Sequence, residues 1–203
     1  SQVINLIKNG LQSGIPVINS DGTIGIQRSE NNIARSQILA DQLDDNPIVR
    51  GSGFSGRGYV AEIARIKRGQ EVMEEDAAVR EEARRKMQSA KDKVARAKQL
   101  RREGGSLTEI LKLVNEAKAI RNKWRDAVNL NREKQVTQAH IKWADQQLEA
   151  VPETKEIFNI WRNINMALID LNEASGNFSK EKADRYRSKK YYVPLFASRV
   201  DMG

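Results

Sequence analysis

The chain contains no cysteine, which excludes disulfides, thiolate nucleophiles, iron-sulfur clusters and cysteine-ligated zinc together. Aromatic residues make up only 5% of the 203 residues and the mean hydropathy is -0.66, so a large globular core is not expected. No stretch approaches 18 consecutive apolar residues, and residues 1–10 lack the layout of a signal peptide. These absences predict a soluble chain that is not exported by the usual route.

Charge is abundant and unevenly distributed. The chain has 35 lysines and arginines against 27 acidic residues, a formal net charge of +8. Residues 1–58 are balanced, whereas residues 59–105 and 106–203 each contribute +4. This balance favours an anionic partner such as a nucleic acid, a membrane surface or an acidic protein.

The N-terminal segment, residues 1–58, is rich in Gly, Asn, Ser and Asp. Apolar runs at 15–18 and 23–26 flank an Asp-Gly turn signal, which predicts a small β-hairpin. Because an isolated hairpin is only marginally stable in water, we expect it to pack against another element. Residues 30–45 show helical spacing up to an Asn-Pro pair. Four closely spaced glycines then predict a flexible joint: Gly51, Gly53, Gly56 and Gly58.

Long helices are predicted from residue 59 onward. Residues 60–102 contain one glycine and no proline among strong helix formers. A Gly-Gly pair ends this helix, and Ser106 with Glu109 spells a capping box. A second helix is expected from 107 to about 150, an apolar third one from 153 to 175, and a short fourth one capped by Ser179.

The first two helices should fold back as an antiparallel hairpin, because only about four residues join them. Their apolar residues alternate at coiled-coil spacing, and the pairing brings Glu116 near Lys93 and Glu109 near Leu100. Small side chains make a thin seam, so we expect the third helix or another subunit to cover it. The seam residues are Ala83, Met87, Ala90, Val94 and Ala97, and Ile110, Leu113, Ala117, Ile120, Trp124 and Ala127.

The predicted fold class is therefore mainly α: a long antiparallel helical hairpin plus shorter C-terminal helices, with a small N-terminal β-hairpin and loop region. The expected segments are 1–58 (loops, a β-hairpin and a short helix), 59–150 (the αα-hairpin) and 151–203 (C-terminal helices and an extended Tyr-Val-Pro segment).

No catalytic constellation emerges from the sequence. Residues 51–56 spell G-x-G-x-x-G, but no βαβ unit can surround them, so a linker is favoured over a phosphate cradle. Ser52 and Ser55 have no nearby base, since the only histidine is His140. His140 also lacks metal-ligating neighbours on its helix face, Asp145 being five residues away. We predict no enzyme activity, no cofactor and no metal site, and we expect the three tryptophans to be packing anchors.

A basic stretch is the clearest functional signal. Residues 84–102 hold nine cations against the single acid Asp92. Arg84, Lys91 and Lys98 recur every seven residues, so they form a stripe along the helix that can follow a phosphate backbone. An acidic block upstream, between residues 71 and 82, equally allows pairing between copies of the chain, and a plain solvated surface is the third alternative. The candidate nucleic-acid-binding residues are Arg84, Arg85, Lys86, Lys91, Lys93, Arg96, Lys98, Arg101 and Arg102.

The C-terminal segment resembles a module of the large polyvalent proteins of phages and mobile elements. The resemblance covers about residues 156–199: an apolar helix, a glycine, the short helix 179–187, and Tyr-Tyr-Val-Pro-Leu-Phe at 191–196, with Arg199 after it. It implies an internal virion or ejection protein that is packaged in the virion and delivered into the host cell. The start without Met and the ending at residues 201–203 predict a processed product or a piece of a longer protein.

Two functions are expected from these observations. The first is a structural segment of a phage internal virion or ejection protein that forms homo-oligomers or binds other virion proteins, and contacts double-stranded DNA during genome delivery. The second is an accessory nucleic-acid-binding domain of a phage or plasmid polymerase or helicase. Membrane contact is not expected from this segment, because the residues beside the basic stripe are mostly alanine.

Overall fold

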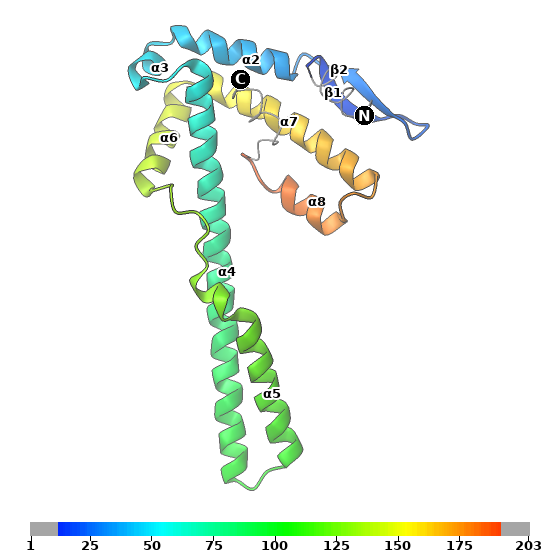
Figure 1. The fold of residues 1–203 in the computed structure, drawn as a ribbon, viewed down its shortest axis with the longest axis vertical. Coiled ribbons are helices and arrows are strands. Elements are labelled where there is room, and N and C mark those ends of the chain that lie inside the picture. Colours follow the sequence, from blue (N-terminus) through cyan, green and yellow to red (C-terminus); the bar gives the residue numbers. More distant parts are fainter. Residues whose placement is uncertain (1–11, 192–203) are drawn as a thin grey trace. The chain divides into compact units, whose positions relative to one another are not determined.

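A computed structural model describes residues 12–191 of the chain. The described residues form two compact units, one of residues 70–135 and one of the residues before and after them. The mainly helical fold is as predicted (Figure 1). Its elements are β1 (Gly14–Ile18), β2 (Ile24–Arg28), α2 (Ile33–Gln42), α3 (Pro47–Ser52), α4 (Gly56–Arg102), α5 (Leu107–Trp124), α6 (Gln138–Ala150), α7 (Glu153–Ala174) and α8 (Lys180–Arg187), with 3-10 turns at Leu43–Asp45 and Asp126–Asn129.

The predicted β-hairpin is confirmed. Strands β1 and β2 pair antiparallel, with Ile18 opposite Ile24. The side chain of Asp21 stabilises the turn by accepting hydrogen bonds from the amide and hydroxyl of Thr23 at 2.9 and 2.6 Å. An isolated two-stranded hairpin is marginal in water, and β1 packs against α7, as the sequence required.

The expected flexible joint at residues 51–58 is wrong. Gly51 lies in α3, Gly53 ends that helix with φ 78°, and Gly56 begins α4. A Cβ atom on Gly56 would lie 1.9 Å from the carbonyl oxygen of Ala40, so a side chain is sterically excluded there. The glycines thus allow a tight turn and a close helix approach, which the composition alone could not distinguish from a linker.

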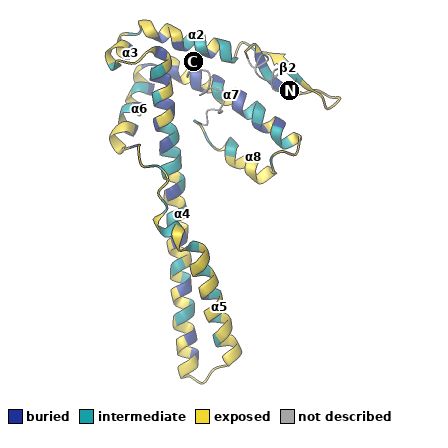
Figure 2. Cartoon of the chain, in the orientation of Figure 1, coloured by how far each residue is buried: buried dark blue, intermediate teal, exposed yellow. Residues whose placement is uncertain are grey.

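Helix α7 carries the main hydrophobic core of its unit, as its apolar sequence predicted. It packs against β1, α2 and α8, and its buried face is visible in Figure 2. Ile160 and Ile164 are each 2% exposed. Partly buried hydrophobic side chains from β1, α2 and α7 pack against them. These are Ile15, Ile33, Leu39, Trp161 and Leu168.

Helix α8 is tied to α7 by charge. Ser179 caps α8 by accepting a hydrogen bond from the amide of Lys182 at 3.2 Å, as predicted. Arg187 at its other end contacts Asp170 of α7 at 2.8 Å, and also Glu173. The rest of the predicted Tyr191–Phe196 strand, beyond Tyr191, and Arg199 lie outside the described residues.

The unit of residues 70–135 contains the predicted hairpin, in which α5 runs back along α4 (Figure 1). Lys93 donates to Glu116 at 2.5 Å, so the predicted pairing of these two residues is confirmed. Gly104, with φ 73°, ends α4, but Ser106 makes no side-chain capping hydrogen bond, so the predicted capping box is wrong.

The second arm of the hairpin is shorter than predicted, and the expected helix through residue 150 is wrong. Helix α5 ends at Trp124, and a new helix, α6, begins after Thr137, whose hydroxyl accepts from the amide of His140. The intervening chain is held in a non-helical path by tertiary hydrogen bonds. Arg80 donates to the carbonyl of Leu130 at 2.5 Å, and the Arg132 amide donates to Asp76 at 2.6 Å. Tertiary contacts have here overridden helix propensity.

Candidate nucleic-acid interface

The nine predicted basic residues lie on the C-terminal half of α4, where strong helix formers keep the helix continuous. The side of α4 that faces α5 is marked by Ala83, Ala90 and Ala97, which are at most 3% exposed. All nine basic residues lie outside this alanine row, and all except the half-buried Lys93 are exposed. The structure therefore places the predicted set on one helix, but on different sides of it.

The Lys93–Glu116 pair assigns these sides. Residues two positions apart on a helix point in nearly opposite directions, at about 200°. Lys91 thus lies on the opposite flank of the hairpin from Lys93, and Lys118 on the opposite flank from Glu116. Because the helices are antiparallel with 93 opposite 116, Lys91 of α4 and Lys118 of α5 lie at about the same level.

One flank of the hairpin is therefore basic on both helices. We define the basic flank as Arg84, Lys91 and Lys98 of α4 together with Lys118 and Arg121 of α5. All five residues are exposed. The two α5 residues were missed in the sequence analysis, which considered the basic run of α4 alone, although the predicted Lys93–Glu116 register already implies their side of the hairpin.

The other flank, called the paired flank here, has its charge partly neutralised. It holds Lys93 with Glu116, and Lys93 holds the pKa of the Glu116 carboxyl below its ordinary value. Of the nine predicted residues, Arg85 also forms an ion pair, with Glu81 at 3.2 Å. The other seven form no ion pair within residues 12–191.

The charge excess of the part of the hairpin where the two helices run side by side, residues 84–125, is larger than that of the whole chain. Residues 84–125 hold 14 lysines and arginines against 4 acidic residues, a net charge of +10, compared with +8 overall. At its turn end the basic flank borders three exposed apolar residues of α5, namely Leu107, Leu111 and Val114. The positive potential of the chain is therefore concentrated on the hairpin.

The acidic block upstream is largely engaged within the chain. Asp76 is fully buried and accepts hydrogen bonds from the amide and the Nε of Arg132, both at 2.6 Å. Burial alone would raise the pKa of Asp76, but these two hydrogen bonds and the nearby charge of Arg132 hold it below its ordinary value. Arg132 also contacts Glu75 at 3.1 Å. Two residues of the acidic block therefore hold the chain between α5 and α6 at Arg132.

The alternative sites weighed in the sequence are occupied by structural contacts. At the G-x-G-x-x-G segment, the Gly56 amide donates to Asp44 at 2.6 Å and the Gly58 amide to the Ser55 hydroxyl at 3.1 Å. The Gly56 amide, at the end of the motif, and the Gly58 amide just after it are thus already hydrogen-bonded within the chain. His140 lies in the first turn of α6, where its Nδ1 accepts from the Thr137 amide at 3.3 Å. Across residues 12–191, no group of three or more His, Asp or Glu residues could hold a metal ion.

The tryptophans make packing contacts, in line with the prediction. Trp143 meets the ring of Tyr59 edge-on at 6.1 Å, and burial raises the pKa of the Tyr59 hydroxyl to about 12. Trp161 donates its indole N–H to Ser36 at 3.1 Å. Trp124 is half-buried at the end of α5, with the Lys123 ammonium 5.6 Å from its ring centre.

Comparisons with protein-family models, curated proteins and solved structures found no match to this chain. The resemblance of the C-terminal segment to polyvalent phage proteins therefore stays a prediction. None of the helices within residues 12–191 combines the length and apolarity needed to cross a membrane.

Proposed function

We propose that the α4–α5 hairpin binds double-stranded nucleic acid through its basic flank, by contacts to the sugar-phosphate backbone. The observation that carries this proposal is the difference between the two flanks. Among residues 12–191, the cations of the basic flank on both helices form no ion pair, whereas Glu116 compensates Lys93 on the paired flank.

The spacing of the basic flank suits an extended polyanion. Arg84, Lys91 and Lys98 are seven residues apart, which is about 10 Å per step along the helix and about 21 Å in all. Packed helices lie about 8–10 Å apart, so the α5 cations form a second row at a distance similar to the width of a DNA groove, about 12 Å. The two rows could therefore meet phosphates of two strands.

Such contacts position a protein on a duplex without reading its sequence, because lysine and arginine contacts to phosphates are the same at every base pair. Binding should also weaken with salt, because each neutralised phosphate releases counterions. With about five contacts, the slope of log K against log salt should be about -4 to -5.

The test is fluorescence anisotropy of a labelled duplex of about 20 base pairs at several salt concentrations, with two unrelated sequences. Equal affinities for the two sequences and a steep salt slope would support the proposal. A flat salt dependence, or strong preference for one sequence, would contradict it.

Self-assembly is the weaker of the two expected functions. Residues 84–125, with a net charge of +10, repel the same segment of another copy, and Glu75, Asp76 and Glu81 of the acidic block are engaged within the chain. Virion packaging and ejection rest on the C-terminal resemblance and remain a hypothesis. The molecular mass measured by light scattering, with and without duplex DNA, tests self-assembly. A defined multimer whose mass does not change with DNA would favour assembly over nucleic-acid binding.

A further inference from the structure

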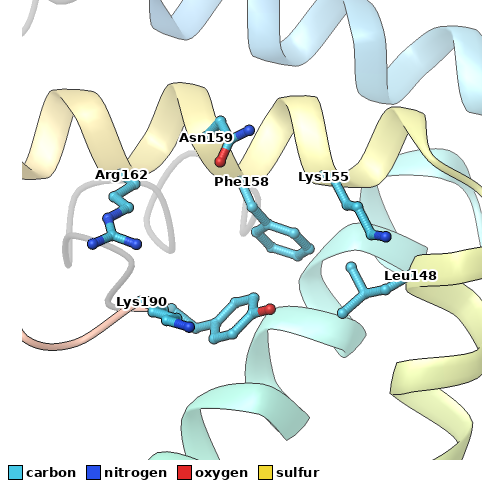
Figure 3. Close-up of a pocket in the computed structure, with 7 residues that line it drawn as sticks. Leu148, Lys155, Phe158, Asn159, Arg162 and Lys190 are labelled. Atoms are coloured by element: carbon cyan, nitrogen blue, oxygen red, sulfur yellow. The ribbon is translucent and has the colours of Figure 1, made fainter.

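A small cavity lies beside α7 in the unit that contains the β-hairpin (Figure 3). Its volume is about 230 Å³. One wall is α7. The other walls come from α6 and from Lys190 and Tyr191, which follow α8 in the chain. The lining residues are Leu148, Lys155, Phe158, Asn159, Arg162, Lys190 and Tyr191.

The lining is positively charged. Three of its seven residues are cations, and none is acidic. Figure 3 shows Arg162 and Lys190 at one end of the cavity and Lys155 at the other, with the ring of Phe158 between them. Lys155 is paired with Glu149 at 2.8 Å, whereas Arg162 forms no ion pair with any described residue. The Arg162 end is thus the stronger place for an anion.

The middle of the cavity is aromatic and held in position. Phe158 is 8% exposed and meets the ring of Tyr191 edge-on, with ring centres 5.4 Å apart. Trp161 packs against Phe158 at 5.5 Å, and the ammonium of Lys67 lies 5.6 Å from the centre of the Tyr191 ring. Each ring is therefore supported from a second side, so the cavity wall is preorganised.

We infer that this cavity binds a nucleotide, with its phosphate between Arg162 and Lys190 and its base against Phe158 and Tyr191. A phosphate monoester is recognised by arginine and lysine through charge-assisted hydrogen bonds. A planar base gains stacking and edge contacts from aromatic rings. The volume of about 230 Å³ is small for a ligand site, so it limits the ligand to a single nucleotide, either free or at the end of a single strand. The inference does not depend on the α4–α5 hairpin.

The test is isothermal titration of the full chain with AMP, adenosine, inorganic phosphate, and a short single strand with and without a 5′-phosphate. We expect AMP to bind about tenfold or more tightly than either adenosine or phosphate alone, because each of these lacks one half of the contacts. If only the 5′-phosphorylated strand binds in this way, the nucleotide is a strand end; if AMP binds as well, it can be free.

Variants at the cavity supply the controls. Arg162→Gln and Lys190→Gln, both at exposed positions, should each weaken binding of the probe about tenfold. Lys142→Gln removes an exposed cation on α6 away from the cavity and should leave binding unchanged. Circular dichroism establishes that each variant is folded.

Three results would overturn the inference: no binding of either AMP or the phosphorylated strand, equal affinity for inorganic phosphate and for the tighter-binding of these two probes, or unchanged affinity for that probe in Arg162→Gln. A further variant separates this site from the hairpin. The triple change Arg84→Glu, Lys91→Glu and Lys98→Glu should abolish duplex binding and leave AMP binding intact, so failure of one proposal is distinguishable from failure of the other.

Discussion

The Lys93 ammonium on α4 lies 2.5 Å from the Glu116 carboxylate on α5, and this contact divides the hairpin into a paired flank and a basic flank. Both side chains are about one-third exposed, so the pair lies at the edge of the alanine seam. On the opposite side of the hairpin, the cations of the basic flank form no ion pair with any residue that the structure describes.

Single substitutions on the two flanks should differ in their effect on duplex binding. Lys91→Gln removes a phosphate contact and should make the salt slope less steep by about one. Lys93→Gln removes the same charge from the paired flank, where Glu116 already neutralises it, and should leave the slope nearly unchanged. Anisotropy at several salt concentrations measures both. A larger change of the salt slope in Lys93→Gln than in Lys91→Gln would mean that the duplex binds the paired flank, which contradicts the proposal.

Asp76→Asn should destabilise the unit of residues 70–135. Asp76 is buried and holds the chain at Arg132, and a neutral side chain weakens both charge-assisted hydrogen bonds at a cost of about 1–3 kcal/mol. Glu74→Gln is the control, because Glu74 is exposed and bonds only to Gln70 within the described residues. Urea unfolding followed by circular dichroism compares the two, and equal stability of both variants would contradict this role of Asp76.

The Asp76 contact should also make stability depend on pH. Its pKa is lower in the folded chain than the ordinary value of 3.8, so the unfolded chain binds its proton first as pH falls. The stabilisation is therefore complete well above pH 3.8 and is lost as pH falls through the lower, folded value. Urea unfolding between neutral and acidic pH should show a smaller loss in Asp76→Asn than in the parent chain. Parallel losses would argue against the assignment.

Gly56→Ala and Gly51→Ala should have opposite effects on stability. A Cβ on Gly56 would clash with the Ala40 carbonyl oxygen at 1.9 Å, so overpacking should cost about 1–3 kcal/mol or more. A Cβ on Gly51 meets nothing within 4 Å, and this residue lies in α3, so alanine should be neutral or stabilise by up to about 1 kcal/mol. Thermal unfolding distinguishes these results, and tolerance of Gly56→Ala would mean that the joint is loose.

The sequence predicted those parts of the fold that depend on local patterns. The β-hairpin, α7, the cap at Ser179 and the Lys93–Glu116 pair all follow from spacing, turn residues and helix periodicity. The end of α5 was missed because it depends on Asp76 and Arg132, which are 56 residues apart. Such a contact leaves no periodic signal.

The candidate interface was predicted in part. The clustering of basic residues on α4 is visible in the sequence, and the predicted Lys93–Glu116 register implies the two flanks. Which cations stay exposed and which form ion pairs required the side-chain contacts of the structure. The cavity beside α7 could not be predicted, because Arg162 and Lys190 come together only through the packing of α7, α8 and the residues after α8.

The most direct test of the account compares two triple variants with equal charge changes. The first variant reverses the charge of the three α4 residues of the basic flank: Arg84→Glu, Lys91→Glu and Lys98→Glu. The second reverses the charge of three exposed cations outside that flank: Lys86→Glu, Arg96→Glu and Lys112→Glu. In duplex anisotropy at low salt, the first variant should lose binding and the second should keep most of it. Equal loss in both would show that total charge, and not the basic flank, determines binding, and would contradict the proposed interface.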